Sequence, residues 1–207
     1  SDLSSHKMIP LGELVDLQQG LAINKKSKHL LVEKSNLPLL RITDLINSKE
    51  TQFVDEEKVP KQFIADDNSL IYTRTGQVGL VFRNRHGVVH NNCFKIIFGE
   101  NLDKDYLYYA LKQKRVYGHA NQIAQKAAQP DLTHGAFKSI SIELHPIDIQ
   151  KKVGLVLNEY DALINLNERR IKILEEMAQT IYYEWFVDFQ FPGHEKVELV
   201  DSKTDFG

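Results

Sequence analysis

The chain has 207 residues, of which 42% are hydrophobic and 26% are charged, and its formal net charge is −2. This composition excludes a disordered chain, and the length predicts one globular domain of ordinary size plus an extension. A membrane-spanning helix needs about 18 consecutive apolar residues, and the sequence contains no such stretch.

Charge is unevenly divided along the chain. Residues 1–148 carry 19 Lys and Arg against 17 Asp and Glu, which gives +2, whereas residues 149–207 carry 7 against 11, which gives −4. The single cysteine, Cys93, excludes an internal disulfide framework and fits the cytoplasm, which is the location that we expect. The first part is therefore mildly basic, which allows a phosphate-binding face but does not require one.

Residues 8–17 (MIPLGELVDL) are interpreted as a short strand or turn that leads into one helical turn. A polar loop follows and contains three lysines, Lys25, Lys26 and Lys28. The loop has two interpretations, a solvated surface loop or a flexible positive segment that contacts DNA phosphates. Residues 37–46 (LPLLRITDLI) then predict a strand, in which Arg41 either pairs with a carboxylate such as Asp44 or points into a polar site.

Residues 69–98 show the clearest strand pattern, with apolar runs separated by Gly76 and Gly79. Between these runs lies a compact group of hydrogen-bond donors, Thr73, Arg74, Thr75 and Gln77. Arginine and glutamine are side chains that pair bidentately with guanine and adenine edges, so DNA contact is one interpretation and an ordinary polar turn is the other. Two arginines in the next turn, Arg83 and Arg85, are further DNA-binding candidates.

Residues 103–117 predict an amphipathic helix that Gly118 ends. The stretch after it is rich in amides and poor in large apolar side chains, and it is either a base-contacting loop or a connector in which Asp131 or Thr133 caps a short helix. Its DNA-binding candidates are Gln122, Gln125, Lys126 and Gln129. Residues 140–145 alternate as a strand, and Pro146 ends it.

A long helix is predicted over residues 149–186, followed by a polar tail over residues 187–207. At about 1.5 Å per residue the helix would run roughly 55 Å, which is longer than the preceding domain needs for its own core. Its apolar stripe either folds back on that domain or pairs with another long helix, and Asn167 at a heptad a position favours a register-fixing partner. The candidates for this partner surface are Val153, Tyr160, Leu163, Asn167, Ile171, Leu174 and Ile181.

Sequence signals for catalysis are absent. The histidines lack the spacing of a zinc site, and no phosphate loop, nucleophile elbow or dinucleotide-binding glycine motif is present. Cys93 lies in an apolar run and is expected to be a core residue. We therefore expect no metal, no cofactor and no enzyme activity in this chain.

Several strings, in this order, resemble the specificity (S) subunits of type I restriction–modification systems: IPLGELVDLQQG, LPLLRITDL, NSLIYTRTGQVG, VVHNNCFKIIF, LYYALKQ, AAQPDLTHGAFKSISIELHP and ILEEMAQTIYYEWFVDF. The resemblance covers about residues 8–190. It implies a target recognition domain that reads one half of a split DNA site, and a long helix that packs against its counterpart and offers a platform to methyltransferase (M) subunits. It also implies that S-adenosylmethionine, Mg and ATP are bound only by partner subunits, and that the restriction (R) subunit joins indirectly.

The usual chain of that family has two recognition domains and two helices, whereas this sequence has one set. It is therefore interpreted either as a half-length subunit that acts as a homodimer or as an excised first half.

These observations predict an α+β fold with a DNA target recognition domain at residues 1–148 and a coiled-coil-type helix at residues 149–186. We expect the Arg74–Gln77 group, the 122–129 segment, Lys25 and Lys26 to lie on one concave basic face. We also expect two helices to pair antiparallel, which implies a palindromic split target. One alternative is a recognition domain that serves another modification enzyme, and the other is a coiled-coil scaffold whose globular head binds protein.

Overall fold

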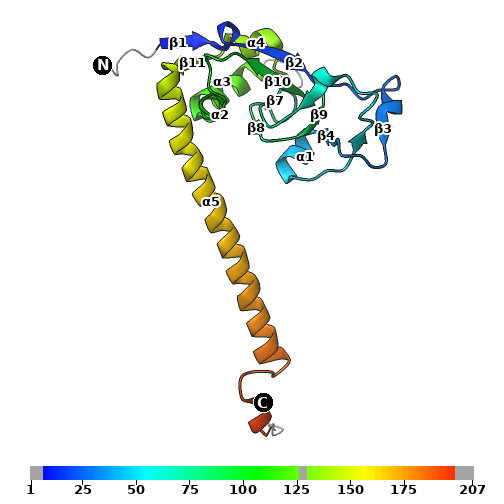
Figure 1. Cartoon of the computed structure of the whole chain (residues 1–207), viewed down its shortest axis with the longest axis vertical. Coiled ribbons are helices and arrows are strands. Elements are labelled where there is room, and N and C mark those ends of the chain that lie inside the picture. Colours follow the sequence, from blue (N-terminus) through cyan, green and yellow to red (C-terminus); the bar gives the residue numbers. More distant parts are fainter. Residues whose placement is uncertain (1–6, 126–129, 199–207) are drawn as a thin grey trace. The chain divides into compact units, whose positions relative to one another are not determined.

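The computed structural model describes residues 7–125 and 130–198. The chain divides into two compact units, Ser1–Asn158 and Glu159–Gly207, which we call the globular unit and the arm unit. Figure 1 shows a mixed region of strands and helices in the first and a helix in the second, which confirms the α+β class expected from the sequence.

A four-stranded antiparallel sheet forms the centre of the globular unit. Its strand order is β2 (Val15–Gln19), β10 (Cys93–Phe98), β7 (Leu70–Thr73) and β8 (Val81–Arg83). Alternation along β10 directs Phe94 and Ile96 into the largest core, whereas on the opposite face Cys93 is buried in a smaller core and Ile97 is 49% exposed.

Helices cover this sheet and share its largest core. They are α2 (Lys104–Lys112), α3 (Lys114–Ala124) and α4 (His134–Ser139). The Asp103 side chain accepts a hydrogen bond from the Tyr106 backbone N–H at 2.9 Å, and Thr133 caps α4 in the same way at 3.2 Å. Of the two caps that the connector interpretation considered, Asp131 and Thr133, the structure shows Thr133.

The prediction that Gly118 ends a helix is wrong. The chain breaks earlier, at Gln113, where ψ is 135°, and α3 then continues through Gly118 to Ala124. Consequently Gln122 lies on a helix rather than in a loop.

A second group of short strands has its own small cores. It contains β3 (Leu31–Val32) paired with β5 (Phe53–Val54), and a β4–β9–β6 sheet made of Leu39–Leu40, Gly87–Val89 and Ile64–Ala65. The strand predicted over residues 37–46 is mostly wrong, because β4 is only its centre and α1 (Ile42–Asn47) follows. Arg41 pairs with Asp44 at 2.7 Å, as one of its two interpretations expected.

Short elements complete the globular unit. Strand β1 (Lys7–Pro10) pairs antiparallel with β11 (Ser141–Leu144), which confirms the strand expected before Pro146. Single 3₁₀ turns lie at Leu11–Glu13, Lys28–Leu30, Lys61–Phe63 and, in the arm unit, His194–Lys196.

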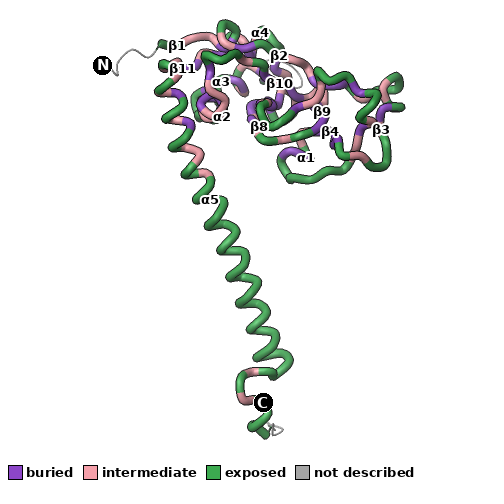
Figure 2. Tube along the Cα trace, in the orientation of Figure 1, coloured by how far each residue is buried: buried purple, intermediate pink, exposed green. Residues whose placement is uncertain are grey.

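The long helix α5 runs from Ile147 to Tyr182, and one π-helical turn follows at Tyr183–Val187. Its first residues belong to the globular unit, which ends at Asn158 rather than at residue 148. Val153 packs against the globular core, so its assignment to a partner surface is corrected. Beyond Asp161 every residue of α5 is exposed, as Figure 2 shows. Among residues 7–125 and 130–198, no helix is long and apolar enough to cross a membrane.

Candidate nucleic-acid interface

The turn between β7 and β8 is built on two glycines with left-handed backbone. Gly76 has φ +71° and Gly79 has φ +97°, a region that other residues rarely adopt. The Thr73 hydroxyl closes the turn, since it donates to the Gln77 carbonyl and accepts from the Leu80 N–H at 2.9 Å. Thr73 is fully buried, so the prediction that it contacts DNA is wrong.

Arg74 fastens a distant segment to this turn. Its Nη2 atom donates to both Asp131 oxygens, at 2.6 and 2.8 Å, and its guanidinium lies 5.4 Å from the Phe94 ring centroid. The backbones join as well, because the Leu132 N–H donates to the Arg74 carbonyl at 2.9 Å. The Arg74 side chain is 16% exposed and its Nη2 atom is already bound to Asp131, so we interpret Arg74 as a positioning residue, and base contact by it stays a prediction.

Thr75 and Gln77 line an open cavity of about 820 Å³. Its other walls are the outer side of α1, one asparagine before β10, and the segment that Arg74 holds: Ile42, Thr43, Ile46, Asn47, Gly76, Asn92, Pro130 and Asp131. The Thr75 hydroxyl is buried and has no hydrogen-bond partner among the described residues. Hydroxyls, amides and exposed apolar groups are the side chains that contact base edges, so this cavity is the candidate interface.

Sequence reasoning missed Thr43, Asn47 and Asn92 as members of this site. Thr43 was assigned to the strand predicted over residues 37–46 and Asn47 lies just beyond it, and only their place on α1 brings them to the cavity. The Asn91–Asn92 pair between two strands was the one local signal that could have found Asn92.

Arg83 has a different role from the one predicted. Its Nη1 atom donates to Asp105 and Asn158, both at 2.5 Å, and its guanidinium lies 4.1 Å from the Tyr108 ring centroid. The side chain is only 14% exposed. The assignment of Arg83 to DNA binding is therefore corrected, because its charge is held inside the globular unit.

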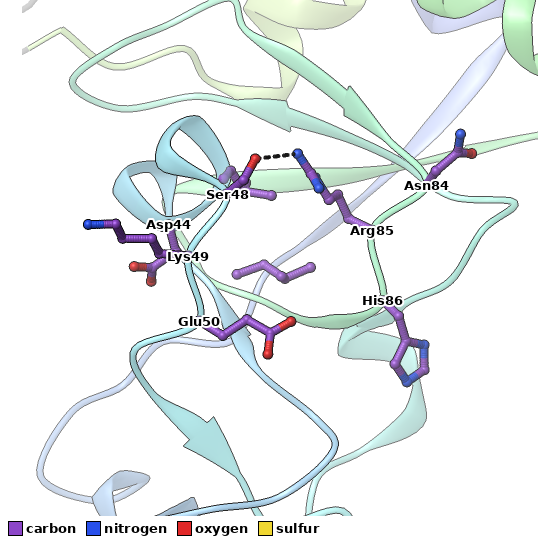
Figure 3. A pocket seen from close by; sticks show the side chains of 9 residues that line it. Asp44, Ser48, Lys49, Glu50, Asn84, Arg85 and His86 are labelled. Carbon is purple, nitrogen blue, oxygen red and sulfur yellow. Dashed lines mark hydrogen bonds between the residues drawn. The ribbon is translucent and has the colours of Figure 1, made fainter. Parts of the chain in front are cut away.

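Arg85 lies at a separate, smaller pocket of about 200 Å³. Figure 3 shows its guanidinium directed at Ser48, the residue that ends α1, and the two are joined by a 3.1 Å hydrogen bond. Lys49 lines the same pocket, but so do the carboxylates of Asp44 and Glu50. Because basic and acidic side chains both line the pocket, it has no clear preference for an anion such as a DNA phosphate. DNA contact by Arg85 stays a prediction.

The remaining candidates within residues 7–125 and 130–198 are exposed but do not line the cavity. Lys25, Lys26 and Lys28 lie between β2 and β3, where the Lys26 N–H donates to the Asn24 side chain at 2.9 Å. Gln122 and Gln125 lie at the end of α3, while Lys126 and Gln129 lie outside the described residues. The single face that we expected is therefore supported only for Thr75 and Gln77, and DNA contact by the lysines and by Gln122 and Gln125 stays a prediction.

Titratable groups near these walls are biased toward their neutral forms. Burial and the nearby Arg41 lower the pKa of His90, whose Nδ1 atom lies 3.5 Å from the Asn92 N–H. Burial also raises the pKa of the Cys93 thiol to about 12, which confirms it as a core residue. No group of three or more metal-ligating side chains is found within residues 7–125 and 130–198.

Comparison with known proteins places the sequence in a family. Residues 4–176 match the family described as "Type I restriction modification DNA specificity domain". The type I restriction enzyme MjaIX specificity subunit of Methanocaldococcus jannaschii is 27% identical over 123 residues, which are 59% of this chain and 28% of that protein.

Solved structures show the same fold. A type I restriction–modification S subunit from M. genitalium superposes with a TM-score of 0.64 at 18% identity, over 96% of this chain and 51% of that one. A structure of a type I restriction–modification system in assembly superposes with a TM-score of 0.65 at 16% identity, over 87% of this chain and 45% of that one. The chain thus spans about half the length of these neighbours and about a quarter of the curated archaeal subunit.

The family model matches most of the sequence, and the shared fold agrees with it. The chain belongs to the type I restriction–modification DNA specificity family.

Proposed function

We propose that the globular unit reads one half of a bipartite double-stranded DNA target. The observation that supports this proposal is the cavity between α1 and the glycine turn. Polar side chains from separate parts of the sequence line it, namely Thr43, Asn47, Thr75, Gln77 and Asn92. A buried hydroxyl without a partner is costly, and Thr75 Oγ1 is such a group in the free protein. A base edge entering the cavity would supply the missing hydrogen bond.

Phosphate contacts would come from elsewhere on the surface. Lys25, Lys26 and Lys28 are exposed on one loop, and contact with phosphates requires only mobile positive charge. In this arrangement the cavity selects the sequence, and the lysines strengthen binding to all sequences.

The test begins with selection from a randomised duplex library, followed by gel shifts of the selected duplex across a salt series. Affinity should fall steeply with salt if phosphates are neutralised. Gln77→Ala and Asn92→Ala should relax the preference at individual positions by roughly 1–3 kcal/mol per lost contact. Gln62→Ala, at an exposed amide outside the cavity lining, is the matched control.

Replacing Lys25 and Lys26 by alanine should weaken binding to all duplexes alike and reduce the salt slope. Selection that returns no shared sequence, with affinity indifferent to salt, would contradict the proposal. That result would favour the alternative of a scaffold whose globular head binds protein.

The arm supplies the second half of the proposal. We propose that two copies pair through antiparallel α5 helices, so that two globular units read the two halves of a palindromic split target. Methyltransferase subunits would dock on this platform and the restriction subunit would join through them, with S-adenosylmethionine, Mg and ATP bound by those partners. The supporting observation is the row of exposed apolar side chains along α5, among them Leu163, Leu174 and Ile181 at 51%, 63% and 42% exposure.

A further inference from the structure

One face of α5 is polar where the helix begins, and it contacts the start of α2. Gln150, Gly154 and Asn158 are spaced four residues apart, so they lie above one another on the helix surface. All three belong to the globular unit.

Gln150 makes the first of these contacts. Its side chain is buried, its Oε1 atom accepts from the Asp103 N–H at 2.9 Å, and its Nε2 atom donates to the His145 carbonyl at 2.8 Å and the Asn101 carbonyl at 3.3 Å. A buried amide with both ends bonded holds a single orientation. The start of α5 is therefore held to the residue that caps α2.

Gly154 sets the closest approach between the two helices. A Cβ atom there would lie 3.0 Å from Asp103 Oδ1, 3.1 Å from Asp105 Cβ and 3.2 Å from the Tyr106 backbone nitrogen. Any larger residue would require these neighbours to move by a few tenths of an ångström, and one of them is a backbone atom.

Asn158 ends the face in a partly buried charged network. Its Oδ1 atom accepts from Arg83 at 2.5 Å and from the Tyr109 hydroxyl at 3.0 Å, and its Nδ2 atom donates to Asp105 at 2.7 Å. The charged partners come from β8 and α2, so this one amide joins a strand and two helices. Hydrogen bonds to charged groups are stronger and more directional than the apolar contacts beside them.

We propose that Arg83, Gln150 and Asn158 are positioning residues that lock the first turns of α5 into the globular unit and so set the direction in which the helix leaves it. The purpose of this lock rests on the proposed function, because two half-sites at one separation require readers held at one separation. Apolar contacts alone would allow the first turns of α5 to shift along the globular unit, whereas the hydrogen bonds of this network require one geometry.

The test measures an internal distance and needs no DNA. Spin labels are attached to the full chain at Glu57→Cys and Glu175→Cys, both exposed positions, and the labelled chain is diluted with unlabelled chain so that intrachain pairs dominate. Cys93 is fully buried with its pKa raised to about 12, so it should not take up label. We expect one narrow distance distribution for the parent and an about twofold broader one for Asn158→Ala, since a directional hydrogen-bond set is lost.

Asn165→Ala is the matched control, because it removes the same amide from an exposed position further along α5. It should leave the distribution unchanged. A broad distribution in the parent, or an unchanged width in a folded Asn158→Ala chain, would overturn the inference.

Gly154→Ala is the second variant, used where Asn158→Ala fails to fold. Alanine favours the helix itself, but its Cβ requires the neighbouring α2 residues to move by a few tenths of an ångström, so the first turns of α5 should tilt and the mean distance to position 175 should shift. An unshifted mean would also overturn the inference.

In the duplex selection, Asn158→Ala should recover the parent half-sites over a wider range of spacings, whereas a merely destabilised chain would lose affinity for all spacings alike. Failure to bind DNA at all would contradict the proposed function and leave the distance measurement valid.

Discussion

Arg74 and Gln77 lie three residues apart in one glycine turn, but their side chains have different surroundings and are therefore expected to have different roles. Gln77 is exposed at the cavity, whereas the Arg74 guanidinium is bound to Asp131 and holds residues 130–132 against the turn. Side-chain chemistry made both candidates for base reading. Their positions within the fold leave Gln77 as a candidate for base contact and show Arg74 in a structural contact.

Arg74→Ala should therefore act on stability and on all DNA sequences alike. Removing one partner of this partly buried pair leaves the Asp131 charge uncompensated, which costs about 1–3 kcal/mol of unfolding free energy. Urea unfolding measures the loss, and Arg74→Lys should recover only part of it because lysine lacks the planar fork. A stable Arg74→Ala chain with an altered base preference would instead restore the base-reading role.

His90 predicts how stability depends on pH. Burial and the charge of Arg41 lower its folded pKa, although Asp44 opposes the shift. The unfolded chain therefore binds more protons below the ordinary histidine pKa of about 6.5, and stability should fall as pH drops from there toward the folded pKa. His134 is shifted in the same direction by burial and Arg74.

Urea midpoints measured from neutral to mildly acidic pH test this dependence. His90→Gln keeps a polar side chain but cannot take up the proton, so its midpoint should fall less than the parent's. An identical slope for both chains would show that His90 does not contribute. The exposed His29 provides the control as His29→Gln.

Among the helices and strands, the sequence predicted best those whose position depends on neighbouring residues, such as capped and amphipathic helices. Amphipathic spacing and the acidic residues Asp103 and Asp105 located α2, Thr133 was one of two caps considered for α4, and the long helix was predicted two residues after the observed start of α5. The strand predicted at residues 37–46 was mostly wrong because a continuous apolar run does not distinguish a buried strand from the two-residue β4 followed by α1. The prediction that Gly118 ends a helix relied on glycine being a poor helix former. The helix continues through Gly118 because it packs Val116 and Ala120 into the core.

Gly118→Ala should consequently stabilise the chain. The position is exposed within α3, and an added Cβ would meet nothing within 4 Å. Alanine is better than glycine in a helix interior by about 1 kcal/mol, which thermal and urea unfolding can resolve.

Gly20→Ala is the contrasting substitution at a glycine that the fold requires. Its Cβ would lie 2.2 Å from the His90 carbonyl oxygen and 2.5 Å from that of Val89, both backbone atoms. A loss of roughly 1–3 kcal/mol or more is expected from such overpacking. If Gly118→Ala destabilised the chain as well, the helical assignment at Gly118 would be wrong.

For the whole molecule, what the sequence could not predict is the meeting of distant residues. Arg74 and Asp131 are 57 positions apart, and Arg83 and Asn158 are 75 apart. Both arginines were called DNA-binding because only the fold shows that they have partners within the chain. Thr43, Asn47 and Asn92 were missed for the same reason, since nothing local joins α1 to the glycine turn.

Two chains are expected to assemble through their α5 helices. Along α5 the residues Leu157, Tyr160, Ile164, Asn167, Ile171, Leu174, Ala178 and Ile181 follow at alternating spacings of three and four. This spacing is that of a helix seam, and Tyr160 and Leu174 are each 63% exposed. Light scattering should therefore give twice the chain mass of 23.8 kDa.

Leu174→Glu and Ile181→Glu should each produce monomers, because a carboxylate buried in the seam has no partner. Asn165→Glu adds the same charge to an exposed position outside this spacing and should leave the dimer intact. The substituted residues are exposed in the single chain, so the thermal unfolding of the globular unit should not change and loss of mass can be separated from loss of fold. A parent chain that is monomeric, and whose mass neither glutamate alters, would leave the apolar row of α5 to another partner and remove the two-fold arrangement on which the palindromic target depends.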